Sequence, residues 1–273
     1  MIKSLITFFF ALTLLVSGSP RYNEVSWLCT HNSYNASNSG FRFTNHTLSI
    51  QEQLDSGVRA FMLDIHRVNN TLVLSHGTKG LYLLGSVPLK DELKTYHDFL
   101  TKHPEAIVTF IIESSVSAAD VTAAISAAGL DQLAHSQDRN KPWPTLDALR
   151  QSGKRLIIFS DRVKGKIVPL WYHDMWRHCT ETHWSNKTPE NLLANRPGRG
   201  KKANPLFILN HFILNPISKP SLAQSVNNLA FFKKRYAAFQ KSHPNRRPNF
   251  ITVDFSSKGD GLKFVEFLNA QKR

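Results

Sequence analysis

The sequence contains little cysteine and few acidic residues. Its 273 residues include two Cys, and 20 Asp+Glu stand against 34 Lys+Arg, which gives a formal net charge of +14. Two cysteines are too few for a disulfide scaffold, and 41% hydrophobic residues exclude a disordered chain. The shortage of acids favours an anionic partner: nucleic acid, an anionic membrane surface or a phosphorylated small substrate.

The apolar run at the start of the chain is too short to span a membrane, which takes about 20 residues. This run, residues 5–16, follows the basic Lys3 and precedes the small residues at 17–19. That order predicts a secretory signal peptide over residues 1–18, with an uncleaved membrane anchor as the alternative. We therefore expect residues 19–273 to form the mature protein, secreted to the extracellular space or the periplasm.

The two cysteines leave two possibilities open. In an exported protein Cys29 and Cys179 can form one disulfide, which would close a loop of about 150 residues and add about 4 kcal/mol by chain entropy. Two free, buried thiols are an equal alternative.

Short apolar or β-branched runs recur along the chain and predict strands. They cover residues 25–29, 58–63, 72–74, 107–112, 156–159, 206–209 and 250–253, with 166–168 as a weak eighth. Segments with helical spacing lie between most of them: Leu89, Leu93, Tyr96 and Leu100; Leu222, Val226, Ala230 and Phe231; and residues 261–270. Strands that alternate with helices indicate a parallel sheet. We expect a single α/β domain, an irregular TIM-type (βα)8 barrel.

Polar residues follow nearly all of these runs. They are His31 and Asn32, Asp64 and His66, His76, Glu113, Asp161, Asn210 and His211, and Asp254. In a barrel the carboxyl ends of parallel strands gather at one mouth, where the active site lies. The pattern therefore predicts a catalytic site at this mouth.

The residue types at these positions suit phosphoryl chemistry. His31 and His76 lie at different strand ends, as a base and an acid on opposite sides of a phosphorus should, and each can titrate near neutral pH. Asn32, Asp64 and Glu113 offer oxygen ligands, the set that Ca²⁺ or Mg²⁺ prefers. Such an ion neutralises charge that develops on a phosphate.

Several segments in order resemble the catalytic X region of phosphatidylinositol-specific phospholipase C. They are Thr30-His31-Asn32-Ser33-Tyr34, Gly57-Val58-Arg59, Met62-Leu63-Asp64, Ser75-His76-Gly77, residues 107–113, Trp143-Pro144-Thr145-Leu146, residues 153–161 and residues 249–255. The resemblance covers nearly the whole mature chain, and it is strongest to the small, stand-alone X-domain proteins.

The resemblance implies a TIM-type barrel and a reaction. His31 would deprotonate the inositol 2-hydroxyl as it attacks the phosphorus, and His76 would protonate the diacylglycerol oxygen, giving diacylglycerol and a cyclic inositol phosphate. Family members use either calcium or an arginine at one position, which here is Asp64. The resemblance thus implies a metal-dependent enzyme, with Ca²⁺, or alternatively Mg²⁺, on Asn32, Asp64 and Glu113.

Other residues are candidates for contacts in the same site. Arg59, Lys154 and Asp161 would contact substrate: Arg59 could offset phosphate charge, and Lys154 resembles a substrate-side basic residue of the family. Asp254 could orient the catalytic base. For Arg59, Lys154 and Asp254 a purely structural role is the alternative. The sequence departs from the family at Met62, where another acidic ligand is expected, so cation binding should be weaker. The expected protein is a secreted phospholipase C-type phosphodiesterase acting at an anionic phospholipid surface, with no nucleic acid and no dedicated protein partner.

Four alternatives accompany this interpretation. A zinc site would use His173, His178, Cys179 and His183, although their spacing matches no recognised structural zinc site. Cys29 shares a strand face with His31, which admits a thiol nucleophile. The basic segments 196–202 and 233–247 suggest nucleic-acid binding, but no nucleic-acid-binding motif accompanies them. A catalytically silent X domain that binds anionic lipid is the fourth alternative.

Overall fold

The structure is a computed structural model that describes residues 18–76, 84–163 and 168–271. The predicted signal peptide, apart from Gly18, lies outside the described residues, and so does most of the weak strand predicted at 166–168. Within the described ranges, no helix is both long and apolar enough to cross a bilayer.

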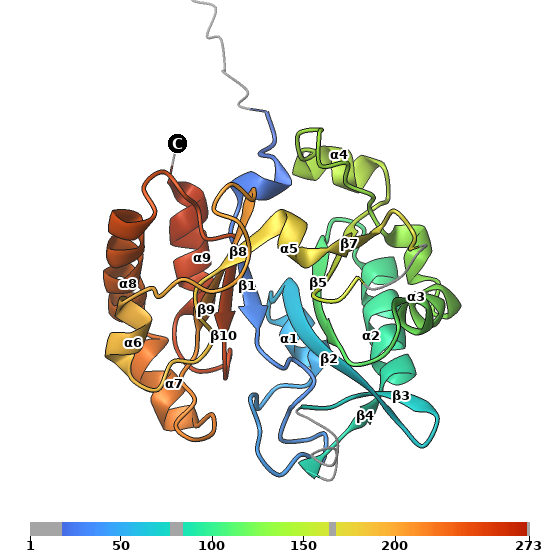
Figure 1. Ribbon diagram of the computed structural model, residues 1–273, viewed down its shortest axis with the longest axis horizontal. Helices are drawn as coiled ribbons and strands as arrows, with labels where there is room; N and C mark the ends of the chain where they lie inside the picture. Colours follow the sequence, from blue (N-terminus) through green and yellow to red (C-terminus); the bar gives the residue numbers. More distant parts are fainter. Residues whose placement is uncertain (1–17, 77–83, 164–167, 272–273) are drawn as a thin grey trace, which may run out of the picture.

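Eight parallel strands form a curled sheet (Figure 1) in the order β7-β6-β5-β2-β1-β10-β9-β8. Their bounds are β1 Trp27–Thr30, β2 Ala60–Val68, β5 Val108–Ser114, β6 Leu156–Ser160, β7 Tyr172–Asp174, β8 Cys179–Glu181, β9 Leu206–His211 and β10 Phe250–Val253. Each neighbouring pair in this order is parallel. Among the described residues β7 and β8 are not paired, so the barrel is open along one side. The predicted irregular TIM-type barrel is confirmed.

Two features of the sheet differ from the prediction. The run at 72–74 is β3 (Thr71–Leu74), which is not a barrel strand: it turns back and pairs antiparallel with β2 and with β4 (Val87–Pro88). Asn69 and Asn70 make this turn with φ of 45° and 64°, which Asn tolerates better than most residues. The barrel strands β7 and β8 were missed because each has three residues, too few to show an apolar run.

Most of the helices cover the outer face of the sheet, whereas α4 and α5 lie at the end of the barrel where β1 begins (Figure 1). Their bounds are α1 Ile50–Asp55, α2 Leu89–Lys102, α3 Ala118–Ala127, α4 Leu146–Gln151, α5 Met175–His178, α6 Pro189–Leu193, α7 Pro220–Val226, α8 Leu229–Ser242 and α9 Gly261–Ala270, with short 3-10 turns at Tyr22–Glu24 and Leu130–Leu133. The predicted apolar face of α2 is buried, and α9 has the predicted bounds. The face predicted over 222–231 is instead divided, because the Asn228 side chain accepts a hydrogen bond from Phe231 N at 2.9 Å and starts α8.

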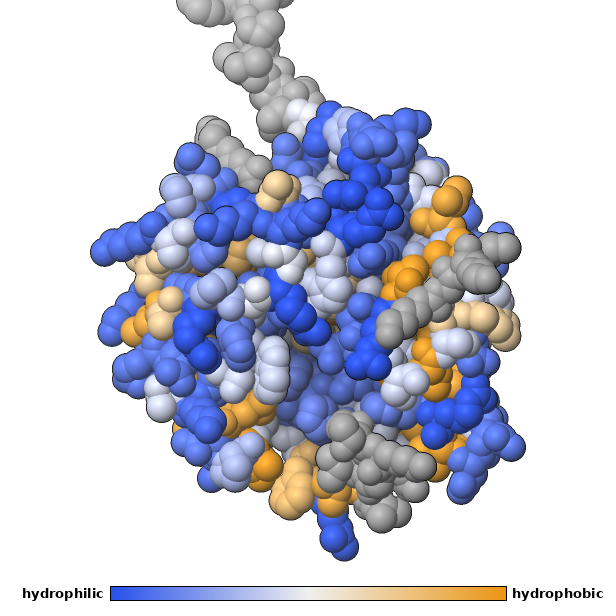
Figure 2. All heavy atoms as spheres, in the orientation of Figure 1, coloured by the Kyte–Doolittle hydropathy of each residue, from blue (hydrophilic) through white to orange (hydrophobic). Residues whose placement is uncertain are grey.

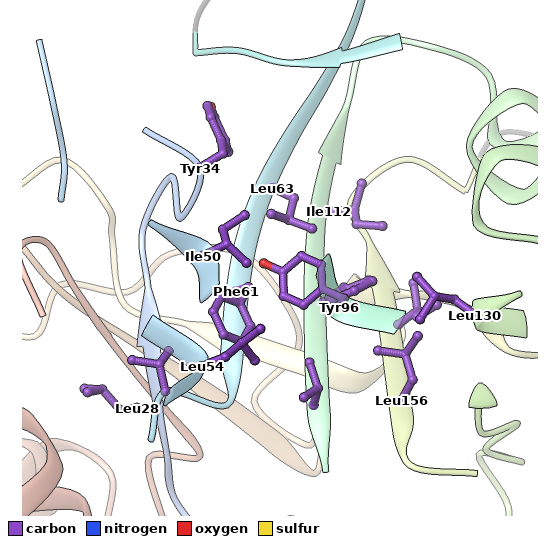
Figure 3. Close-up of a cluster of buried hydrophobic side chains, with 14 of the residues drawn as sticks. Leu28, Tyr34, Ile50, Leu54, Phe61, Leu63, Tyr96, Ile112, Leu130 and Leu156 are labelled. Atoms are coloured by element: carbon purple, nitrogen blue, oxygen red, sulfur yellow. The ribbon is translucent and has the colours of Figure 1, made fainter. Parts of the chain in front are cut away.

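Alternate residues of the strands enter two cores. Phe61 of β2 points outward and packs on Tyr96 of α2, with ring centroids 5.0 Å apart (Figure 3). Phe110 of β5 packs on the same Tyr96 ring, with centroids 4.6 Å apart. Met62 and Ile111, one residue further along these strands, belong to a second cluster inside the barrel. Because side chains fill the barrel interior, a site for substrate must lie at one end.

Candidate active site

The carboxyl ends of five strands bring the predicted polar residues to one mouth. His31 follows β1, Asp64 and Glu113 lie opposite each other in β2 and β5, Asp161 follows β6, and Asp254 follows β10. Parallel strands that point the same way place these residues together although they are up to 223 positions apart in the chain.

The His31 ring is held on two sides. Its Nδ1 lies 3.0 Å from Asp254 Oδ1, and the ring stacks on Phe212 with centroids 3.9 Å apart and planes 2° apart. With Nδ1 engaged, Nε2 is the nitrogen left to face a substrate.

Asp254 is buried and receives hydrogen bonds on both oxygens. The Asn45 Nδ2 atom donates to Oδ1 at 2.9 Å, and the Ser218 hydroxyl donates to Oδ2 at 2.6 Å. Burial by itself raises the pKa of this carboxyl, but the attraction of His31 and His46 and the hydrogen bonds from His31 and Ser218 hold it below its ordinary value. The Asp254 carboxyl is therefore ionised at neutral pH and orients the His31 ring.

His76 occupies the facing position. Its ring centroid is 6.4 Å from that of His31, and its Nδ1 lies 3.2 Å from Asp64 Oδ2. The hydrogen bond to Asp64 raises the pKa of His76, so the imidazole keeps its proton to higher pH. The amide nitrogen of Asn32, which has a left-handed φ of 48°, is 3.1 Å from the same Nδ1.

The carboxylates of Asp64 and Glu113 lie close together beside the histidines and repel each other. Burial and the charge of Asp64 raise the pKa of Glu113 to about 7, and its side chain is still 48% exposed to solvent. A cation between Asp64 and Glu113 would relieve this repulsion, and carboxylate and amide oxygens are donors of the type that a hard cation takes. Among the described residues, however, no group of three or more His, Cys, Asp or Glu could hold an ion. Met62 is packed inside the barrel and adds no ligand.

A family profile described as PI-PLC X 1 matches residues 18–269. The chain belongs to this family. A PI-PLC X domain-containing protein of Arabidopsis thaliana is 29% identical over 277 residues, which cover 94% of the chain and 63% of that protein. PI-PLC X domain-containing protein 1 of Arthroderma benhamiae is 27% identical over 285 residues, covering 95% of the chain and 90% of that protein. The chain thus spans less than two thirds of the length of the Arabidopsis relative.

Solved structures agree with the fold. The phosphatidylinositol-specific phospholipase C of Listeria monocytogenes superimposes with a TM-score of 0.65 at 16% identity, covering 93% of this chain and 96% of that one. A mutant of the Staphylococcus aureus enzyme gives a TM-score of 0.59 at 16% identity, covering 93% of both chains. At these identities the likeness shows the barrel fold and carries no residue role.

Arg199 is a cation at the mouth of this PI-PLC X barrel that was not predicted from the sequence. Arg199 Nε lies 2.8 Å from the buried Glu181 of β8, its Nη2 lies 3.4 Å from Glu113 Oε1, and its guanidinium stacks over Trp176 at 4.2 Å. Asn210 Nδ2 donates to the other Glu181 oxygen at 3.0 Å, so the carboxylate that holds Arg199 is itself fixed.

Two glycines, Gly198 and Gly200, flank Arg199 in its loop. A Cβ on Gly198 would lie 2.6 Å from Glu181 Cγ, and one on Gly200, which has φ of 89°, would lie 2.2 Å from the Cys179 carbonyl oxygen. Two glycines around an arginine allow this loop to lie directly on β8. In the sequence Arg199 lies within the basic segment 196–202, and nothing in that segment indicates that this arginine reaches the mouth.

Two predicted substrate contacts do not reach this mouth. Arg59 begins the β2 region and donates to the carbonyl oxygens of Leu54 and Val58 at 2.7 Å and 2.8 Å. Lys154 precedes β6, and its Nζ donates to Gln132 O at 2.7 Å. Both residues lie at amino ends of strands, opposite the mouth, so their assignment is corrected to structural roles. Asp161 does lie at the mouth, where its Oδ1 accepts a hydrogen bond from Ser114 N at 3.2 Å.

The cysteine and zinc alternatives do not fit the structure. Cys29 and Cys179 are buried and free, and burial raises the pKa of Cys29 to about 12, so it is no nucleophile at neutral pH. Both ring nitrogens of His173 are used, one with Ile158 O at 2.8 Å and the other accepting from Gln137 N at 2.9 Å. The His173 region is therefore a packed structural cluster.

Proposed function

We propose that the protein is a phospholipase C-type phosphodiesterase that cleaves inositol phospholipids to diacylglycerol and a cyclic inositol phosphate. The observation that carries the proposal is the pair of facing histidines, 6.4 Å apart, each held through Nδ1 by a different carboxylate. Membership of the PI-PLC X family supports the substrate class.

In this proposal the two histidines move one proton each. His31 Nε2 accepts the proton of the inositol 2-hydroxyl as that oxygen bonds to phosphorus, and Asp254 stabilises the resulting imidazolium. His76, kept protonated by Asp64, donates its proton to the diacylglycerol oxygen as the bond between that oxygen and phosphorus breaks. Water can then reopen the cyclic phosphate with the two roles reversed.

Charge on the reacting phosphate needs a positive partner. Asn32, Asp64 and Glu113 would hold Ca²⁺, or Mg²⁺ in its place, and the ion would neutralise the phosphate oxygens. Arg199 supplies a fixed positive charge at the same mouth, because Glu181 and Trp176 hold its guanidinium toward Glu113. In this proposal Asp161, at the same mouth, would accept hydrogen bonds from inositol hydroxyls.

We further propose that the protein is secreted and acts at an anionic phospholipid surface. The sequence of the first 18 residues supports export, and an Arthroderma benhamiae relative that is 26% identical is named an uncharacterized secreted protein. The positive excess, +14 for the full sequence and one less without Lys3, favours adsorption to anionic lipid. A second candidate function, lipid binding without cleavage, is favoured by Met62 alone, which leaves the cation with two carboxylates.

The test is release of water-soluble inositol phosphate from phosphatidylinositol vesicles, in Ca²⁺ and in EDTA. We expect release by the wild type, loss in H31A, and no change in H97A, a matched control on α2. Equal activity in Ca²⁺ and in EDTA would show that the reaction needs no cation, and the proposed roles of the two histidines would stand. If the protein binds the vesicles but releases no inositol phosphate with any divalent ion, the proposed enzyme activity is wrong and lipid binding without cleavage is the function.

A further inference from the structure

A cavity of about 360 Å³ lies at the opposite end of the barrel from the histidines. Its lining comes from segments that immediately precede strands: Asn23 lies before β1, His178 before β8 and Pro205 before β9. In Figure 1 these segments meet near α4 and α5, at the end where β1 begins. The volume is within the range of small-molecule sites.

The lining of this cavity, here called the basal cavity, is strongly basic. Its cations are Arg21, Arg139, Lys141, Arg177 and Lys201, and none of its lining residues is acidic. Figure 2 shows mostly hydrophilic side chains over the corresponding upper part of the molecule. Among the described residues, Arg139, Lys141 and Arg177 make no ion pair, so their charges are not neutralised within the protein.

Two of these cations, Arg139 and Arg177, act on one buried histidine. His178 is 4% exposed, lines the basal cavity, and its ring makes no hydrogen bond to another described residue. Burial, and then the charges of Arg139 and Arg177, lower the pKa of His178 to about 4, so the ring is neutral at pH 7. A neutral imidazole keeps one N–H that can donate to an anion.

Side-chain to backbone hydrogen bonds fix the walls of the basal cavity. Gln137 Nε2 ties one wall together by donating to the carbonyl oxygens of Asp138 and Lys141 at 2.7 Å and 3.0 Å. Asn204 Nδ2 ties the other by donating to the carbonyl oxygens of Trp176 and Cys179 at 2.9 Å and 2.7 Å. Preformed walls lower the entropy cost of binding a ligand.

The geometry points to a second ligand site: the basal cavity binds a small ring polyol that carries several phosphate or sulfate groups. Cations from several chain segments surround the cavity, as a ligand with several anionic groups requires, and planar guanidinium groups match tetrahedral oxyanions. Pro142, Trp143 and Pro205 supply apolar surface for the carbon ring. A cavity of about 360 Å³ can admit a small molecule, whereas a nucleic-acid backbone needs an extended basic surface.

Isothermal titration calorimetry at low salt tests the site with two probes, myo-inositol hexakisphosphate and sucrose octasulfate. We expect at least one probe to bind with 1:1 stoichiometry, and the tighter one identifies phosphate or sulfate as the preferred group. In R139Q/R177Q the Kd should rise at least tenfold, because a charge-assisted hydrogen bond is worth more than the roughly 1.4 kcal/mol that a tenfold change represents.

The control variant is K90Q/K102Q, which removes two cations from α2, a helix that contributes no residue to the cavity. Its Kd should stay within twofold of wild type. K201Q, on the other wall, repeats the test should the double variant fail to fold. Absence of binding by both probes, or an equal loss in the control, overturns the site. Tighter binding of a DNA duplex that is lost in the same double variant overturns the ligand class.

Discussion

Replacing Asp254 by Asn tests the role of the buried carboxylate behind His31. Asn fits the site in one orientation: its Oδ1 can still accept from His31 Nδ1 and from Asn45 Nδ2. Its Nδ2 then faces the Ser218 hydroxyl, which can rotate and accept in place of donating. D254N therefore keeps the ring position and the tautomer and removes only the negative charge.

The expected loss follows from that charge. His31 becomes an imidazolium in the transition state, and a hydrogen bond at 3.0 Å to an ionised partner is worth about 1.5–3 kcal/mol. A loss of about 2 kcal/mol lowers kcat roughly 30-fold, with KM nearly unchanged because the interaction strengthens only in the transition state. H31A should lose more, about 10²–10⁴-fold.

The assay is steady-state release of inositol phosphate from phosphatidylinositol in mixed micelles, with S218A as the matched control. S218A keeps the Asp254 charge and removes one hydrogen bond from its far oxygen, so kcat should fall only a few-fold. A D254N variant within twofold of wild type would refute the reasoning. So would a D254N variant as inactive as H31A, because the carboxylate would then do more than orient and stabilise the ring.

Three further predictions follow from other contacts. R199K loses the planar group that stacks on Trp176, so kcat/KM should fall roughly tenfold, and an unchanged kcat/KM would remove this cation from the mechanism. Because the pKa of Glu113 is raised from 4.5 to about 7, the folded state binds that proton more tightly than the unfolded chain, and stability falls as pH rises through this window. E113Q should therefore raise the free energy of unfolding by up to about 1 kcal/mol at pH 8 but not at pH 4, since water screens the half-exposed side chain, and Tm should rise at pH 8 accordingly; a lower Tm at pH 8 would contradict the assignment. Cys29 and Cys179 are free, so dithiothreitol should leave Tm unchanged, and a drop would reveal a disulfide.

The barrel was predictable from sequence wherever a strand is long enough to show an apolar run. The runs ending before His31, Glu113 and Asp254 became β1, β5 and β10, and the polar residues after them meet at one mouth. The short strands β7 and β8 carry His173 and Glu181 in three-residue segments that no periodicity distinguishes from loops. Tertiary pairing with β6 and β9 makes them strands.

Site residues were predictable where they follow a strand and not where a loop supplies them. Arg199 reaches the mouth from the loop before β9, and only its contact with Glu181 reveals the role. Arg59 and Lys154 have the residue type expected of substrate contacts but stand at the wrong ends of their strands. Residue type alone therefore does not predict a substrate contact, because the direction of the strand determines at which end of the barrel a side chain lies.

The central claim is that His31 and His76 act as base and acid on opposite sides of one phosphorus. The most direct measurement compares cleavage of phosphatidylinositol with cleavage of an inositol phosphate ester of p-nitrophenol, whose leaving group needs no proton. H76A should lose about 10²–10⁴-fold on the lipid and far less on the nitrophenyl ester, while H31A loses activity on both. Equal losses of H76A on the two substrates, or undiminished lipid cleavage by H31A, would contradict the account.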